Sequence, residues 1–180
     1  YPGGTLHDLS TNGYSFTSNF FSDMGAYQAR NGEPNYLSMI FFSISLILVG
    51  GTFALYYLVL PKVFGNNNRN YYLSWIGTIF ALGGSICLIG TGLTPTDLVF
   101  DLHVFFANNI FHCFLITSFF YSVVIFDTDI LEKRYAFGYV VFFISILLYV
   151  GVLQFGPSVS TGKSELIFQV VAQKLIVIIF

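Results

Sequence analysis

The stretch YLSMIFFSISLILVGGTFALYYLVL, residues 36–60, decides the fold class of this sequence. It contains no Asp, Glu, Lys or Arg, and about 20 apolar residues in a helix are enough to cross the hydrocarbon core of a bilayer. Hydrocarbon offers no water to the backbone, so each N–H and C=O must be bonded within the segment, as in a helix. The stretch therefore predicts a transmembrane helix.

Further stretches of the same apolar character follow along the chain. They lie at about residues 71–93, 95–126, 136–155 and 165–180. The polar links between them are short, which makes consecutive helices antiparallel neighbours. We therefore predict an all-α fold, a polytopic transmembrane helix bundle over residues 36–180 with five spans in this sequence.

The first 35 residues differ from the rest, being rich in Gly, Ser, Thr, Asn and aromatic residues without a long apolar run. We predict that they form an ordered extracytoplasmic loop, outside the bilayer. Basic residues support this orientation, because they gather on the cytoplasmic side of membrane proteins. Four occur in the links after the first and third predicted spans, and two on the opposite side of the membrane: Lys62, Arg69, Lys133 and Arg134 against Arg30 and Lys163.

The overall composition agrees with a membrane protein. The chain is 55% hydrophobic and 9% charged, whereas soluble domains carry about a quarter charged residues. A net charge of -2 provides no basic face for nucleic acid. We expect membrane lipids as partners, with other membrane subunits as a further class, no nucleic acid and no cofactor.

A cap motif precedes the third predicted helix. Thr94 suits the N-cap position, Pro95 the first helical position, and Asp97 the acidic position of a capping box. A carboxylate there also complements the positive end of the helix dipole. We interpret Asp97 mainly as a helix cap.

Deeper in that helix, Asp101, Asn108 and His112 are spaced by seven and four residues and share one face. Polar groups at membrane depth require partners, so this stripe predicts contact with other helices or a polar pocket. The stripe either forms structural hydrogen bonds between helices, or it has a functional role as a proton relay, a metal site or a pocket for a lipid head. His103 points away from this face.

The last predicted helix has its own polar side, formed by Gln169, Gln173 and Lys174. We interpret Lys174 as snorkelling toward the cytoplasmic interface, with an intramembrane carboxylate partner as the alternative. In the N-terminal loop, Ser22, Asp23 and Gly25 form a short motif that suits a turn or cap. The chain has only three histidines, His7, His103 and His112, and we predict no metal site.

Three groups of residues carry a resemblance to a known family: Tyr1-Pro2-Gly3-Gly4-Thr5, the stretch Ser18–Gly25, and Thr94-Pro95-x-Asp97 with His103. Together they resemble an uncharacterised family of prokaryotic six-helix membrane proteins, a domain of unknown function. The Ser-Asp-x-Gly element also resembles the Ser-Asp-Thr-Gly of the Frag/DRAM/Sfk group, although Met24 departs from it. The resemblance implies a sixth helix before Tyr1, a loop folded against the mouth of the bundle, and a prokaryotic cytoplasmic membrane.

Three functions fit these observations. The first is a non-enzymatic scaffold, lipid-interacting protein or accessory subunit, which we favour because no complete catalytic set is present. The second is a membrane-embedded hydrolase or transferase that acts on a lipid-like substrate through an outer pocket. Its candidate catalytic residues are Asp23, Asp101, His103 and His112. The third is a small proton-coupled transporter along Asp101, Asn108, His112 and Lys174.

Overall fold

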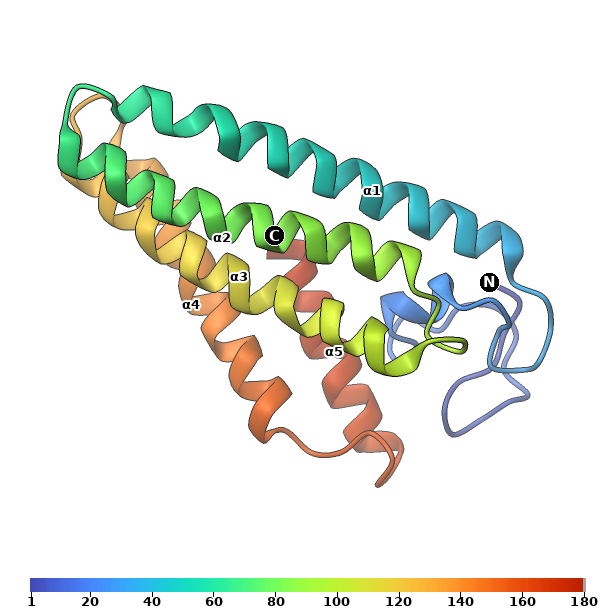
Figure 1. Ribbon diagram of the computed structural model, residues 1–180. Helices are drawn as coiled ribbons and strands as arrows, with labels where there is room; N and C mark the ends of the chain where they lie inside the picture. Colours follow the sequence, from blue (N-terminus) through green and yellow to red (C-terminus); the bar gives the residue numbers. More distant parts are fainter. Residues whose placement is uncertain (180) are drawn as a thin grey trace.

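The computed structural model describes residues 1–179 and contains five α-helices (Figure 1). They are α1 (Tyr36–Val59), α2 (Asn68–Leu93), α3 (Phe100–Asp127), α4 (Lys133–Phe155) and α5 (Lys163–Ile179). Two short 3-10 helices accompany them, η1 (Phe21–Gly25) and η2 (Leu60–Phe64). Within residues 1–179 there is no β-strand, only two isolated bridges, so the predicted all-α fold is confirmed.

Four segments are long and apolar enough to cross a membrane: Tyr36–Phe64, Asn68–Leu93, Phe100–Asp127 and Lys133–Phe155. The fifth predicted span is α5, which has 17 described residues. Its predicted last residue, Phe180, lies outside the described residues. The predicted bundle is therefore present, with four helices of full spanning length and a shorter fifth.

Each helix packs against the next one along the chain, and α2 lies between α1 and α3. Small residues make this possible, because they let helix backbones approach closely. A Cβ added at Gly84 would lie 2.6 Å from the ring of Phe114 in α3, and one added at Gly50 would lie 2.8 Å from the carbonyl of Ser85. Beside these contacts the Thr78 and Tyr121 hydroxyls lie 2.8 Å apart in the core.

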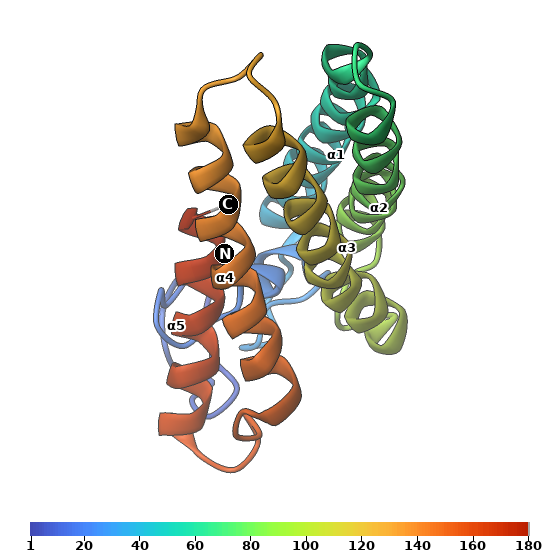
Figure 2. The ribbon, with the colours of Figure 1, turned by 90° about the vertical axis from the view of Figure 1, so that its left-hand side faces the viewer.

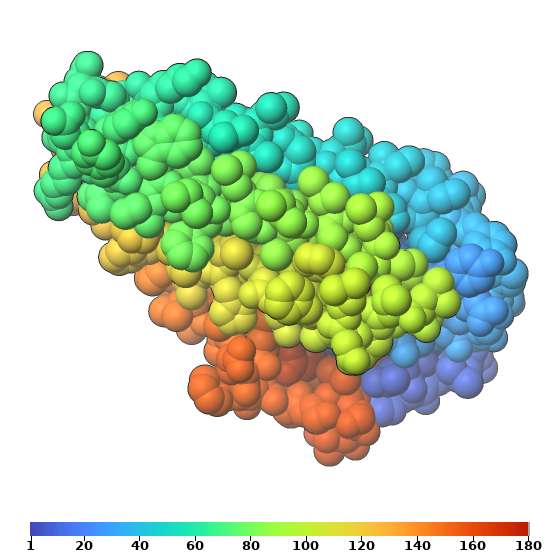
Figure 3. All heavy atoms as spheres, viewed as in Figure 1, coloured from blue at the N-terminus to red at the C-terminus, as the bar shows by residue number. Residues whose placement is uncertain are grey.

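Residues 1–35, the N-terminal segment, lie against the end of the bundle where α1 begins, as Figure 3 shows. Asp97, in the α2–α3 link, accepts hydrogen bonds from the backbone N–H groups of Tyr27 and Gln28. His7 lies 2.8 Å from the carbonyl of Val159 in the α4–α5 link. These two links and the segment therefore share one end, which we call the N-terminal end of the bundle.

The beginning of α3 corrects one prediction. The helix begins at Phe100 rather than Pro95, and Val99 is its N-cap, without a side-chain cap. Thr94 instead ends α2, where its hydroxyl donates to the carbonyl of Gly90. The predicted capping box of Thr94, Pro95 and Asp97 is therefore wrong, because the Asp97 carboxylate bonds the N-terminal segment.

Candidate functional site

A partly open cavity of about 1070 Å³ lies between α1, α2, α3 and α5, under the N-terminal segment. Figure 2 shows α5 apart from α1 and α2, with part of the N-terminal segment between them, while α4 packs against α3. The cavity is mostly apolar, and no Asp, Glu, Lys or Arg is among the described residues that line it. Such a site suits a ligand that is itself largely apolar.

One face of α1 forms the longest wall of the cavity. Its lining residues recur every three or four positions, which is the helical repeat. They include Ser38, Phe41, Phe42, Ser45, Val49 and Phe53. The distance from Ser38 to Phe53 along the helix is about 22 Å at 1.5 Å per residue. This exceeds the depth of one leaflet of hydrocarbon, about 15 Å, so the wall is long enough for an acyl chain.

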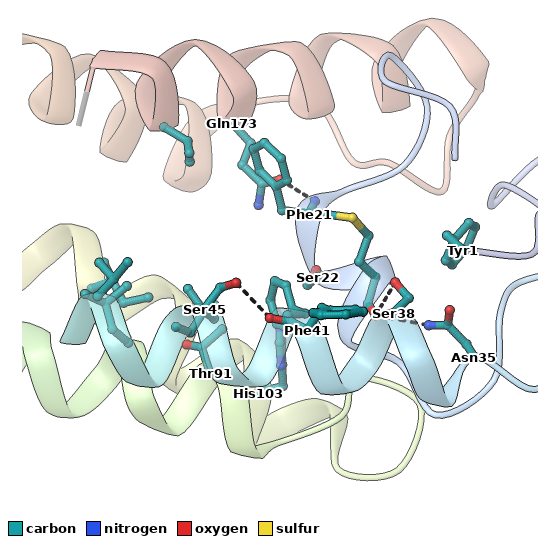
Figure 4. A pocket seen from close by; sticks show the side chains of 18 of the residues that line it. Tyr1, Phe21, Ser22, Asn35, Ser38, Phe41, Ser45, Thr91, His103 and Gln173 are labelled. Atoms are coloured by element: carbon teal, nitrogen blue, oxygen red, sulfur yellow. Dashed lines mark hydrogen bonds between the residues drawn. The ribbon is translucent and has the colours of Figure 1, made fainter. Parts of the chain in front are cut away.

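Most polar groups of the cavity lie toward its N-terminal end, with Ser45 further along α1 (Figure 4). His103 is the best defined of them and only 3% exposed. Its Nδ1 atom hydrogen-bonds the carbonyl of Thr94. Because a carbonyl can only accept, Nδ1 carries the hydrogen, and Nε2 of the neutral ring is left as an acceptor. Within the described residues, Nε2 has no hydrogen-bond partner.

Asn35, which immediately precedes α1, also lines this end of the cavity and is 2% exposed. Its amide nitrogen donates to the carbonyls of Met24 and Ala26, at 3.0 and 2.8 Å. These bonds fix the amide orientation and leave Oδ1 as a buried acceptor, again with no partner among residues 1–179. A buried acceptor without a partner costs about 1–3 kcal/mol, so two at one cavity are informative.

Four neighbouring hydroxyl groups donate their hydrogens to backbone carbonyls. Tyr1 donates to Gly4, Ser38 to Met24, Ser45 to Phe41 and Thr91 to Cys87. Burial raises the pKa of Tyr1, so its phenol keeps that hydrogen at neutral pH. These four oxygens can therefore offer a ligand only lone pairs.

A second polar cluster ties α5 to the N-terminal segment. Lys174 is 1% exposed, and its Nζ donates to the carbonyl of Asn19 at 2.6 Å. The same Nζ lies between 4.5 and 5.1 Å from the ring centroids of Tyr14, Phe16 and Phe21, a cation–π arrangement. The prediction that Lys174 snorkels to the cytoplasmic interface is therefore wrong, because the N-terminal segment covers its ammonium group.

The two glutamines on the same side of α5 also have partners. The Gln173 carbonyl accepts from the N–H of Phe21 at 3.0 Å, as Figure 4 shows. Gln169 donates to the carbonyls of Val152 and Pro157, and so holds the start of α5 against the end of α4. Of the predicted intramembrane polar residues, only Gln173 lines the cavity.

Asp23 organises the N-terminal segment beside this cluster. Its Oδ1 accepts from the Arg30 side chain at 3.0 Å, and its Oδ2 accepts from Asn19 and from the N–H of Phe20. Gly25 follows two residues later, and a Cβ there would lie 2.5 Å from an atom of the Phe42 ring in the cavity wall. The Ser22-Asp23-Met24-Gly25 motif thus forms η1, and Ser22 and Met24 line the cavity.

The predicted stripe on α3 does not form the site. Asp101 is exposed, and the ring of His112 hydrogen-bonds the carbonyl of Asn108 in its own helix. Neither these three residues nor Asp23 line the cavity, whereas His103, which the stripe excluded, does. The structure therefore does not gather the four candidate catalytic residues around one pocket.

Sequence reasoning also missed Asn35, Ser38 and Ser45. A signal was present, since Ser38 and Ser45 are spaced by seven residues and mark one face of the first apolar helix. The orphaned oxygen of Asn35 was not visible, because it depends on the path of the N-terminal segment.

The helices and this site define a polytopic, all-helical integral membrane protein with a cavity between its helices. The chain belongs to the family described as protein of unknown function (DUF998), whose model matches residues 2–180. No curated protein and no solved structure matches it. The family match confirms the predicted uncharacterised family, while the likeness to the Frag/DRAM/Sfk group stays a prediction.

Proposed function

We propose that this protein binds a membrane lipid or a similar amphipathic molecule in the cavity, as a lipid-interacting protein rather than an enzyme. The observation that carries this proposal is the division of the cavity into a long apolar wall and a polar end. A membrane lipid has the same division, with an acyl chain and a polar head. The apolar wall would bury the chain, and the polar end would hold the head under the N-terminal segment.

The other two functions receive less support from the same contacts. A hydrolase or transferase needs a positioned acid and base near the reacting bond. His103 has no carboxylate beside it among the described residues of the cavity wall, and the Asp23 carboxylate is used by Arg30, Asn19 and Phe20. A transport path along Asp101, Asn108, His112 and Lys174 would bypass the cavity, since none of them lines it.

We also infer that the N-terminal end of the bundle faces the outside of a prokaryotic cytoplasmic membrane. The basic residues support this orientation, because Lys62 and Arg69 lie at the opposite end with Lys133 and Arg134. The lipid head would then lie in the outer leaflet. Ser10→Cys and Asn66→Cys test the orientation, by labelling of each introduced cysteine in whole cells.

The experiment that tests lipid binding uses a photoactivatable diacyl lipid with the reactive group on its acyl chain, added to the full chain in nanodiscs. We expect crosslinks to α1 between Ser38 and Phe53. Ser45→Trp should fill the cavity and reduce this crosslinking roughly tenfold, equivalent to about 1.4 kcal/mol of binding.

Ser145→Trp is the matched control, since Ser145 in α4 bonds the carbonyl four residues back as Ser45 does, but does not line the cavity. Equal labelling of the two variants, or crosslinks confined to the outer surface of the bundle, would refute lipid binding in the cavity.

A further inference from the structure

The polar end of the cavity has unpaired hydrogen-bond acceptors and few free donors, which limits the ligands that it can hold. His103 Nε2 and Asn35 Oδ1 are both acceptors, buried and without partners among residues 1–179. The hydroxyl hydrogens of Tyr1, Ser38 and Thr91 are already donated to backbone carbonyls. A ligand that satisfies this end must bring hydrogen-bond donors of its own.

We infer that the cavity selects a neutral lipid whose polar end is a free hydroxyl group, and that His103 Nε2 accepts the one hydrogen bond that this hydroxyl donates. This inference rests on the proposed function and adds the chemistry of the head group. A hydroxyl supplies the missing donor while its oxygen still accepts from other groups. Ser22 and Gln173 line the same cavity, and their hydroxyl and amide groups can donate to that oxygen.

Charged head groups fit this end poorly. A carboxylate or a fully ionised phosphate brings only acceptors, and no Lys or Arg is among the described lining residues to balance its charge. An ammonium group brings donors, but it would be buried without a carboxylate, since no Asp or Glu lines the cavity in the described part of the chain. The pattern of acceptors therefore favours an alcohol over an ionic head.

The fixed positions of the two acceptors give them selectivity. The Thr94 carbonyl holds the His103 ring through Nδ1, and the carbonyls of Met24 and Ala26 hold the Asn35 amide. Neither side chain can turn a donor toward the ligand without breaking these bonds. An analogue without the hydroxyl hydrogen therefore leaves the buried His103 acceptor unpaired, which is the strongest basis for rejecting a close analogue.

The test is a competition on the unaltered full chain in nanodiscs, with the photoactivatable diacyl lipid as the reporter. The competitors are 1,2-diacylglycerol, the same lipid with its hydroxyl acetylated, and phosphatidic acid with the same acyl chains. We expect diacylglycerol to compete roughly tenfold better than either of the others, as one donated hydrogen bond would give. Equal competition, or stronger competition by phosphatidic acid, would overturn the hydroxyl inference while leaving lipid binding intact.

Variants assign the preference to its residues. His103→Phe should reduce the advantage of diacylglycerol over its acetylated form to about twofold, because the ring acceptor is lost. His112→Phe is the matched control on the same helix and should retain the full advantage, since His112 does not line the cavity. An unchanged preference in His103→Phe would remove His103 from the site. Absence of any crosslink in the cavity of the unaltered chain would instead refute the proposed function itself.

Discussion

Lys174 and Asn19, which are 155 residues apart in the sequence, are joined by a hydrogen bond of 2.6 Å from the ammonium group to the backbone carbonyl. The bond connects α5 to the N-terminal segment, the part of the chain that covers the cavity. Gln173, the preceding residue, bonds Phe21 in the same segment. Two consecutive residues of α5 therefore hold the cover of the site in place.

We predict that Lys174→Met loosens this cover. Methionine keeps most of the buried volume but loses the bond to Asn19 and the cation–π contacts, so we expect the free energy of unfolding to fall by about 1–2 kcal/mol. Protease cleavage between residues 14 and 21 should also become faster in detergent micelles. Lys163→Met is the control, because Lys163 is exposed at the start of the same helix. Equal behaviour of the two variants would mean that the ammonium group does not hold the segment.

Asp23→Ala should destabilise the N-terminal segment more strongly. It removes the acceptor of Arg30 and leaves the donors of Asn19 and Phe20 without their partner. The Asp23 side chain is only 6% exposed, whereas that of Arg30 is 39% exposed. We expect a loss of about 3 kcal/mol in chemical denaturation. Glu132→Ala breaks the pair with Arg134, in which both side chains are about two-thirds exposed, and should cost less than about 1 kcal/mol. A similar small effect at Asp23 would show that its network contributes little.

The five helices could be predicted from the sequence because each one depends on a local property, a long apolar run between short polar links. The helix ends were less predictable. Thr94-Pro95-x-Asp97 has the local pattern of a cap, but Asp97 gains two bonds to the backbone of residues 27 and 28. A contact across about 70 residues prevailed over the local motif, and the helix began at Phe100.

The site was less predictable for the same reason. Spacing on α3 grouped Asp101, Asn108 and His112 correctly on one face, but spacing cannot say which face turns inward. The apolar residues Ile110 and Phe114 decide it, and they place His103 inside. Lys174 was misread because its partners, the rings and carbonyl of the N-terminal segment, are more than 150 residues away in the sequence.

Gly84→Ala should disturb the packing of α2 on α3. The added Cβ would lie 2.6 Å from the Phe114 ring, which is 1% exposed and has little room to move. We expect a loss of about 1–3 kcal/mol, the usual cost of overfilling a packed core. Gly51→Ala in α1 is the control, because nothing lies within 4 Å of its added Cβ. That variant should be neutral or slightly more stable, since alanine favours helix. A neutral Gly84→Ala would mean that the helices separate easily.

Asp97→Ala removes a contact between the α2–α3 link and the N-terminal segment. Asp97 accepts from Tyr27 and Gln28 at 2.8 and 2.9 Å, which ties the α2–α3 link to the N-terminal segment. These groups are exposed, so water replaces part of the interaction, and we expect a loss of about 1 kcal/mol, comparable to a lost helix cap. Hydrogen exchange at the N–H groups of residues 27 and 28 should become faster.

Asp101→Ala is the matched control for this variant. Asp101 lies four residues further along and is exposed, and its side chain makes no hydrogen bond or ion pair with residues 1–179. Its replacement should leave both the stability and the exchange of residues 27 and 28 unchanged. A larger effect of Asp101→Ala than of Asp97→Ala would contradict the conclusion that the Asp97 carboxylate holds residues 27 and 28.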